Sequence, residues 1–253
     1  MRHAVIVLLA VSSLSIAART QTADELIAKN IQAKGGMEKI KAIKSVRQIG
    51  KFDLGGGFRA AAVQENERPN LLRQTFSIQG MTAVQAYDGS TGWQIQPFQG
   101  HKDPELMGED DLRDMQLEAD FDNPLVDYKE KGNTVEFLGH DMVDGDDALR
   151  LKVTLKNGDI VYYYLDPDTF LEIRKEIQQF IRGSVRERIV DFGSYKPVNG
   201  VMYPFSSATG TKSNPGAQTF TAEKIEVNVP IPDSDFALPA SLKQAPKPAA
   251  DKK

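Results

Sequence analysis

Cysteine is absent from this chain of 253 residues. Its absence excludes disulfide bridges, thiolate metal ligands, a cysteine nucleophile and the acylated cysteine of a bacterial lipoprotein. Aromatic residues make up only 8% of the chain, with a single tryptophan, Trp93. The fold must therefore be held by its hydrophobic core, and the roughly 220 residues between the two ends are enough for one sizeable domain.

The chain also has no large excess of charge of either sign. Lys and Arg number 31 against 35 Asp and Glu, which gives a formal net charge of -4. With 40% hydrophobic and 26% charged residues, the composition is that of an ordinary soluble protein. Because binding to a polyanion requires a basic excess, we expect no nucleic-acid partner.

Long apolar runs are missing after the first residues. The start of the chain has a basic end at Arg2, an apolar core and a small-residue exit at Ala17 and Ala18, the order of a secretory signal. The apolar run is shorter than the roughly 20 residues that cross a bilayer. We expect residues 1–18 to be removed and the protein to be exported, soluble, to the periplasm. Residues 241–253 have almost nothing to bury and are expected to form a flexible tail, which leaves a domain over residues 19–240.

Two short helices are predicted before the first strand. Thr22 and Glu25 have the spacing of a capping box, and the apolar stripe that follows stops at two glycines, 35 and 36. Residues 37–45 predict a second short helix, with apolar residues at helical spacing. We expect both helices to pack on a sheet.

The rest of the chain alternates between apolar and polar residues, which is typical of strands. Leu149, Leu151, Val153 and Leu155 alternate strictly with polar neighbours. Turn signals such as Asn-Gly, Asp-Gly and Asp-Pro separate the runs. We count about eleven strands and predict a mainly antiparallel β fold, a sandwich or a barrel.

One segment between two strands has a helical pattern instead. In residues 103–121 an Asp-Pro pair can open a helix, and Leu112, Met115 and Ala119 fall at helical spacing among acidic residues. A helix inserted in a sheet must cover something. In an open curved sheet we expect it to lie over the concave face as a lid. Such a lid would enclose a cavity. We further expect Trp93, on the strand before the helix, to face this cavity together with the apolar residues of the helix.

Several motifs that suggest chemistry have simpler interpretations. His101 and His140 have no clustered partners for zinc or for a catalytic triad. The acidic residues 141–147 lack the register of a calcium loop, and the glycines at 55–57 precede no helix that could bind phosphate. Asp166 and Asp168 flank a proline, as a tight turn requires, so we favour a turn over a catalytic carboxylate pair. We predict no metal, no cofactor and no catalytic residue.

Three stretches together resemble the LolA-like family of periplasmic outer-membrane lipoprotein carriers. They are ERPNLLRQTF at 67–76, YDGSTGWQIQPF at 87–98 and YYYLDPDTFLEI at 162–173. The family is known for an Arg-Pro-Asn step into a strand, an Asp-Gly turn followed by Trp and a Pro-Phe pair, and a later Leu-Asp-Pro turn. GGMEKIKAIKSV, NGVMYPF and DFALP are similar to segments of the broader lipoprotein-sorting group. The resemblance touches most of the chain after the signal.

The resemblance implies an unclosed, curved β-barrel with N-terminal helices and a helical lid over an apolar cavity that receives acyl chains. It also implies that Arg68 hydrogen-bonds the backbone of the lid as a latch; the residues alone leave a solvated arginine beside a proline turn equally open. Leu72 stands where the family often has an aromatic residue, and the chain is longer than the core family member. The residues expected to bind the ligand or latch the lid are Arg68, Leu72, Trp93, Phe98, Leu112 and Met115.

The resemblance therefore implies a periplasmic carrier, not an enzyme, that binds acyl chains of lipoproteins or other lipids and moves them toward the outer membrane. An inner-membrane donor and an outer-membrane acceptor would be its partners. A lipid-sensing or regulatory interaction domain with the same fold is the alternative.

Overall fold

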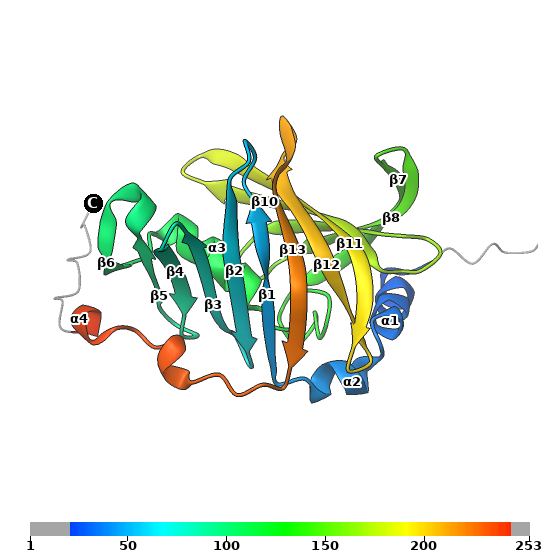
Figure 1. Ribbon diagram of the computed structural model, residues 1–253. Helices are drawn as coiled ribbons and strands as arrows, with labels where there is room; N and C mark the ends of the chain where they lie inside the picture. The colour runs from blue at the N-terminus through cyan, green and yellow to red at the C-terminus, as the bar shows by residue number, and fades with distance from the viewer. Residues whose placement is uncertain (1–20, 244–253) are drawn as a thin grey trace, which may run out of the picture.

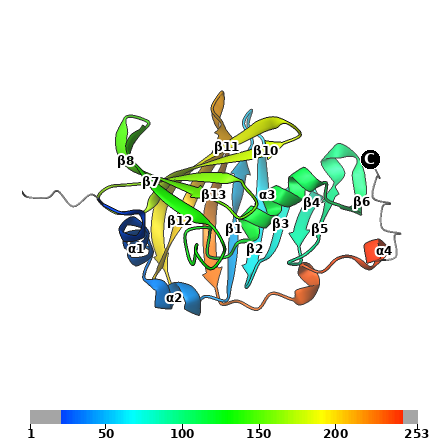
Figure 2. The same ribbon diagram turned by 180° about the vertical axis from the view of Figure 1, so that it is seen from behind.

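A single curved antiparallel sheet of thirteen strands forms most of the computed structural model, which describes residues 21–243. The strands follow the order β6-β5-β4-β3-β2-β1-β13-β12-β11-β10-β9-β8-β7, so β6 and β7 are the two edges and the barrel is unclosed. Figures 1 and 2 show the sheet curving around the helix α3. The predicted fold class is confirmed, with thirteen strands where about eleven were expected. The strands are β1 (Ser45–Asp53), β2 (Arg59–Glu67), β3 (Leu71–Ile78), β4 (Met81–Tyr87), β5 (Gly92–Gln96), β6 (His101–Leu106), β7 (Thr134–Val143), β8 (Asp146–Thr154), β9 (Ile160–Leu165), β10 (Glu172–Ile181), β11 (Ser184–Val198), β12 (Val201–Thr211) and β13 (Asn214–Val227).

The two N-terminal helices are α1 (Ala23–Ala33) and α2 (Met37–Ala42). The predicted capping box is confirmed: the Glu25 N–H donates to Thr22 Oγ1 at 3.2 Å, and the Thr22 N–H donates to Glu25 Oε2 at 3.1 Å. The second helix ends before the predicted residue 45, because Ser45 already belongs to β1 and its hydroxyl donates to the Val229 carbonyl at 2.6 Å.

The helix predicted for residues 103–121 is shorter than expected. Helix α3 covers Glu109–Ala119, and the Asp103-Pro104 pair lies in strand β6 instead of opening the helix. Proline is tolerated there because β6 is an edge strand, where a missing N–H on the open side breaks no ladder bond. The helix begins after Gly108 with three acidic residues in its first turn, which the positive end of the helix dipole stabilises.

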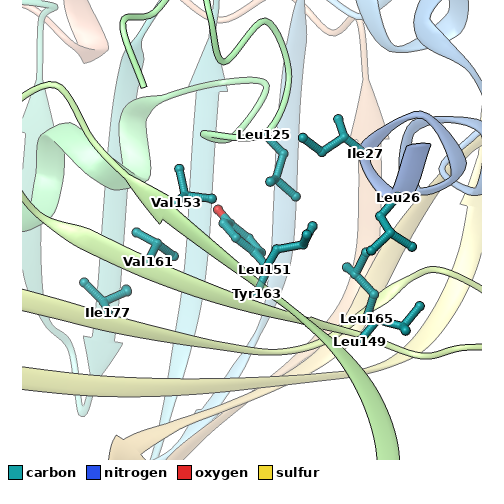
Figure 3. Close-up of a cluster of buried hydrophobic side chains, with 10 residues drawn as sticks. All are labelled: Leu26, Ile27, Leu125, Leu149, Leu151, Val153, Val161, Tyr163, Leu165 and Ile177. Carbon is teal, nitrogen blue, oxygen red and sulfur yellow. The ribbon is translucent and has the colours of Figure 1, made fainter. Parts of the chain in front are cut away.

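The largest core cluster joins α1 to strands β8, β9 and β10. Figure 3 shows Leu26 and Ile27 of α1 pointing toward the apolar side chains of these strands, with Leu125 beside them. The alternation predicted for residues 149–155 holds for the three residues Leu149, Leu151 and Val153, each of them buried. Burial of such side chains contributes about 1.5–3 kcal/mol each. This cluster anchors one half of the curved sheet against α1.

The C-terminal segment after β13 runs along the strand ends to α4 (Ala240–Lys243), beside β6 (Figure 1). It includes the short helix η2 (Asp233–Asp235), and its Ile231 and Phe236 are buried. Residues 241–243 of the expected tail thus belong to a helix. The predicted signal at 1–18 and the remainder of the tail lie outside the described residues. No helix within residues 21–243 is long and apolar enough to cross a membrane.

Candidate functional site

Helix α3 packs on the concave face of the sheet over strands β3 and β4 (Figure 2). In the strand register, Leu72 of β3 lies opposite Tyr87 of β4, and Tyr87 lies opposite Gly92 of β5, so the three share a face. Leu112 and Met115 of the helix pack against that face. The structure therefore brings three of the predicted site residues, Leu72, Leu112 and Met115, into one apolar cluster.

Gly92 makes room for the helix. A Cβ atom at this position would lie 2.8 Å from Cδ1 of Leu112 and 2.7 Å from Sδ of Met107. Real Cβ atoms do not approach so closely, so any larger residue here would displace the side-chain ends of Met107 and Leu112. The glycine of the Asp-Gly-x-x-Gly-Trp turn thus leaves room for these two side chains on β5.

Beyond the helix, the concave face carries three half-buried aromatic residues from neighbouring strands. The ring of Phe52 lies 5.2 Å from that of Phe76 and 5.1 Å from that of Phe220, centre to centre. Such tilted pairs contribute about 0.5–1.5 kcal/mol beyond the area they bury. We call these three residues the aromatic floor. The register places small residues around them on the same face, namely Gly50, Ala60, Ala62 and Ala83.

Arg68 fastens the segment that follows the helix. Its guanidinium donates to both carboxylate oxygens of Asp122, each at 2.6 Å, and to the carbonyls of Ile43 at 2.7 Å and Ile40 at 3.0 Å. The same group lies 4.5 Å from the centre of the Phe121 ring. The interpretation as a solvated arginine is therefore wrong. The expected bonds to lid backbone are also not what is found, because the carbonyls belong to α2 and its end, and the contact to the lid is through the side chain of Asp122.

Asp122 is only 7% exposed and is held as a charged group. Burial by itself would raise its pKa, but the hydrogen bonds and charges of Arg68 and Lys41 outweigh burial and keep the pKa below the usual value. Lys41 Nζ donates to the same carboxylate at 2.6 Å. Bidentate pairs of this kind combine energy with fixed geometry. We call the contacts among Arg68, Asp122 and Lys41 the latch.

A row of ion pairs joins one side of α3 to strand β11 and the hairpin before it. Three acidic residues four apart on the helix each contact an arginine: Asp110 with Arg182 at 3.1 Å, Asp114 with Arg186 at 3.0 Å, and Glu118 with Arg188 at 2.7 Å. Residues four apart lie on one face of a helix. Exposed pairs contribute little to stability, so the inner pair, whose side chains are 27% and 22% exposed, matters most.

Glu118 bridges two halves of the concave face. It accepts from Arg188 of β11 and, at 2.9 Å, from Nε2 of Gln74 of β3. Burial would raise its pKa, but the charges of Arg188 and Lys175 prevail and lower it. The helix is thus held over the sheet by ion pairs on the β11 side, and by apolar contacts and the Gln74 hydrogen bond on the β3 side.

An inner pocket of about 200 Å³ lies between the segment after α3, helix α2 and strands β9 to β12. This volume is below the roughly 300–1,000 Å³ of pockets that hold a whole drug-sized ligand. A shallower hollow of about 420 Å³ lies elsewhere, where the C-terminal segment leaves β13. The inner pocket is lined by Lys34, Ile40, Asp120, Phe121, Asp122, Asn123, Val126, Tyr163, Glu172, Lys175, Phe192, Tyr195, Val201, Met202, Tyr203 and Pro204.

Trp93 does not face the helix, and the expectation of a shared cavity is wrong. It follows Gly92 in β5 and lies opposite Ala86, so its side chain projects from the convex face. There it is 7% exposed, and its Nε1 donates to the Phe236 carbonyl at 3.1 Å. Phe98 lies apart from α3 as well, in the short helix η1 (Pro97–Gln99) between β5 and β6, and is 42% exposed.

The other motifs have the simpler roles that were favoured. Asp166 Oδ1 accepts from the Thr169 N–H at 2.6 Å and from its hydroxyl at 2.8 Å, which confirms the tight turn. His101 and His140 are both exposed and each pairs with a single carboxylate. Within residues 21–243 no group of three His, Cys, Asp or Glu side chains is arranged to hold a metal ion.

The comparisons with known proteins identify the fold. No protein-family model and no curated protein matches the sequence. Among solved structures, a DUF1329 family protein from Desulfovibrio piger is 12% identical with a TM-score of 0.59, covering 86% of this chain and 98% of that one. A LolA superfamily protein from Nitrosomonas europaea is 12% identical with a TM-score of 0.56, covering 87% and 99%. A putative outer membrane lipoprotein-sorting protein domain from Vibrio parahaemolyticus is 12% identical with a TM-score of 0.52, covering 83% and 97%. The chain therefore has the fold of LolA superfamily proteins.

Sequence reasoning missed the partners of Arg68 and the polar groups on the concave face. Asp122 follows the helix without any local motif, so only the folded chain shows that it meets Arg68. Lys175 gave a usable signal: it is in phase with the buried Ile177 on β10, so alternation places it on the inner face. Arg188 lies directly opposite Ile177 and had the same signal.

Proposed function

We propose that this protein is a periplasmic carrier that binds acyl chains of lipoproteins or of another lipid on its concave face, under α3, and moves them toward the outer membrane without changing them chemically. The observation that carries the proposal is the combination of an apolar face with a helix fastened over it by polar contacts. Ion pairs at a rim can open and form again, because water solvates both partners when they separate.

Burial of an acyl chain can compensate for the loss of the latch hydrogen bonds. Charge-assisted hydrogen bonds contribute about 1.5–3 kcal/mol each, so breaking the two from Arg68 to Asp122 costs about 3–6 kcal/mol. Burial contributes about 0.8 kcal/mol per methylene, so about four to eight buried methylenes offset that cost. Acyl chains of biological lipids are longer than this. An acyl chain therefore opens the lid at little net cost, and the latch reforms when the chain leaves.

The fold comparisons agree with this role. The Vibrio parahaemolyticus protein is described as a putative outer membrane lipoprotein-sorting domain, and its fold is shared here. For this chain we propose an inner-membrane donor and an outer-membrane acceptor. The order of residue types at 1–18 supports export, and export supports the proposed location of the protein in the periplasm.

The test is transfer of a labelled lipid between two populations of vesicles by the exported protein. We expect the wild-type protein to extract a lipid with a fluorescent acyl chain and to deliver it to acceptor vesicles. Phe76→Gln in the aromatic floor should weaken extraction about 10-fold or more, because it places an amide where methylenes are buried. The matched control is Phe58→Gln, since Phe58 lies in a hairpin and is 63% exposed.

A thermal melt of both variants separates loss of binding from loss of fold. Failure of the wild-type protein to extract any lipid would contradict the proposal. Extraction without delivery, together with a stable complex with a second protein, would favour the lipid-sensing alternative.

A further inference from the structure

Lys175 is an unpaired cation in the inner pocket. It lies on β10 and lines the pocket, with Nζ 5.6 Å from the centre of the Phe192 ring. Among residues 21–243, no carboxylate forms a salt bridge with it, and its neighbours act on it only through charge and burial. The side chain is half-buried, and a cation in a pocket without a carboxylate partner is costly and often marks a function.

The carboxylates around the pocket are already paired with other cations. Glu172 accepts from Lys34 at 3.1 Å, Asp122 is held by the latch, and Asp120 pairs with Lys131. Glu118, outside the pocket lining, is occupied by Arg188. The lining has two lysines against three carboxylates, and each of these carboxylates pairs with Lys34 or with a cation outside the lining. Lys175 is therefore the one cation of the lining without a salt bridge among the described residues.

Neighbouring donors are also unused. Nε of Arg188 and Nε2 of Gln179 are buried with no hydrogen-bond acceptor among the described residues, and Nη2 of Arg188 has only the Asp114 carboxylate, at 3.9 Å. Both residues share the concave face with Lys175, since Arg188 lies opposite Ile177 and Gln179 lies two residues further along β10. Unpaired donors beside a pocket are groups that a bound anion can use.

We propose that the inner pocket binds the anionic head group, a carboxylate or a phosphate, of the amphiphile whose acyl chain lies under α3. The inference rests on the proposed function, because it names the class of cargo that the carrier takes. A pocket of about 200 Å³ holds a head group but not the chain. The segment after α3 lines this pocket and carries the latch, so opening the latch gives access to both.

The groups that face Lys175 from each packed element fix its charge. Glu118 of α3 and Glu172 of β10 attract it, while Arg188 of β11 and Lys34 after α1 repel it; Tyr163 of β9 and Tyr195 of β11 are neutral, with pKa values raised by burial. Burial is the largest influence and lowers the pKa of Lys175 to about 8. The side chain is thus mostly charged at pH 7, and a bound anion would raise its pKa again.

The experiment compares three probes with the same chain on the exported protein by calorimetry: palmitate, palmitoyl lysophosphatidate and monopalmitoyl glycerol. We expect at least one anionic probe to bind about 10-fold or more tightly than the neutral one. Lys175→Met should weaken the anionic probe about 10- to 100-fold and leave the neutral probe unchanged. Lys152→Met is the matched control, because Lys152 lies on the opposite face of the sheet and pairs with Glu136.

A second measurement is the number of protons that the protein takes up when the anionic probe binds. At pH 8 about half of the Lys175 side chains are neutral, so binding of the anionic probe should take up a fraction of a proton that Lys175→Met abolishes. Calorimetry in two buffers of different ionisation enthalpy measures this uptake. A stronger effect with palmitate assigns a carboxylate, and a stronger effect with lysophosphatidate assigns a phosphate. Equal affinity for neutral and anionic probes would overturn the inference and leave the carrier proposal standing, whereas no binding of any probe would overturn both.

Discussion

Replacing Lys175 with methionine should make the protein more stable at neutral pH. The pKa of Lys175 is lowered from 10.5 to about 8, mainly by burial, and at 1.36 kcal/mol per pH unit this corresponds to about 3 kcal/mol. That figure already includes the attraction of Glu118. Methionine has a similar shape and no charge, so Lys175→Met should recover up to about 3 kcal/mol of unfolding free energy.

The gain should depend on pH in a defined direction. Well below pH 8 the lysine is protonated in both the folded and the unfolded state, and the folded state bears the full cost of the partly desolvated charge. Between pH 8 and 10.5 the unfolded state binds more protons, so wild-type stability rises with pH and the advantage of the variant shrinks. At pH 9.5 the difference should be about 1 kcal/mol.

Urea unfolding of wild type and Lys175→Met at pH 7 and pH 9.5 measures this difference. The control variant Lys152→Met should show no such change with pH, since its partner Glu136 is on the exposed face. A Lys175→Met variant less stable than wild type at pH 7, or a difference that does not change with pH, would show that the buried charge carries no such cost. A stabilising result would mean that the lysine is kept at a cost, as expected of a binding residue.

Three further predictions concern the latch, the sheet and the tryptophan. Arg68→Leu should raise affinity for palmitate about 100-fold or more and slow its transfer to vesicles, because the closed state loses the two bonds to Asp122, about 3–6 kcal/mol together. Weaker binding in a folded variant would instead place Arg68 in contact with the ligand. Gly50→Ala should destabilise the protein by about 3 kcal/mol in urea unfolding, because its Cβ would lie 2.2 Å from a backbone oxygen of β13. Gly108→Ala, where the added Cβ would lie in open space, should cost well under 1 kcal/mol. Equal costs for the two variants would contradict the packing described. Trp93 emission should stay unchanged when palmitate binds and shift to the red in Phe236→Ala, since the indole lies on the convex face; the reverse pattern would place it at the ligand.

The parts of the fold set by local chemistry could be predicted from the sequence. The capping box at Thr22 and Glu25 depends only on residues three apart. The alternation at residues 149–155 reports directly that one side of β8 is buried. The turn at Asp166 depends on its own backbone, and all three were found in the structure.

The parts set by long-range contacts could not be predicted in the same way. The alternation of side chains along a strand predicts that Trp93 and Gly92 face opposite sides of the sheet. Which of these sides meets α3 depends on the C-terminal segment, which covers the convex face and is more than 130 residues away in the sequence. The Asp103-Pro104 pair suits a helix start and an edge strand equally well, and edge position exists only in the folded sheet. The resemblance implied that Arg68 is a latch but not its carboxylate partner.

The most direct test of acyl binding under α3 is photo-crosslinking of the exported protein with palmitate that carries a diazirine near the end of its chain, followed by peptide mass spectrometry. We expect crosslinks to the aromatic floor at Phe52, Phe76 and Phe220 or to α3, and their loss when unlabelled palmitate competes. Crosslinks confined to the convex face, around Trp93 and the C-terminal segment, would contradict acyl binding under the helix.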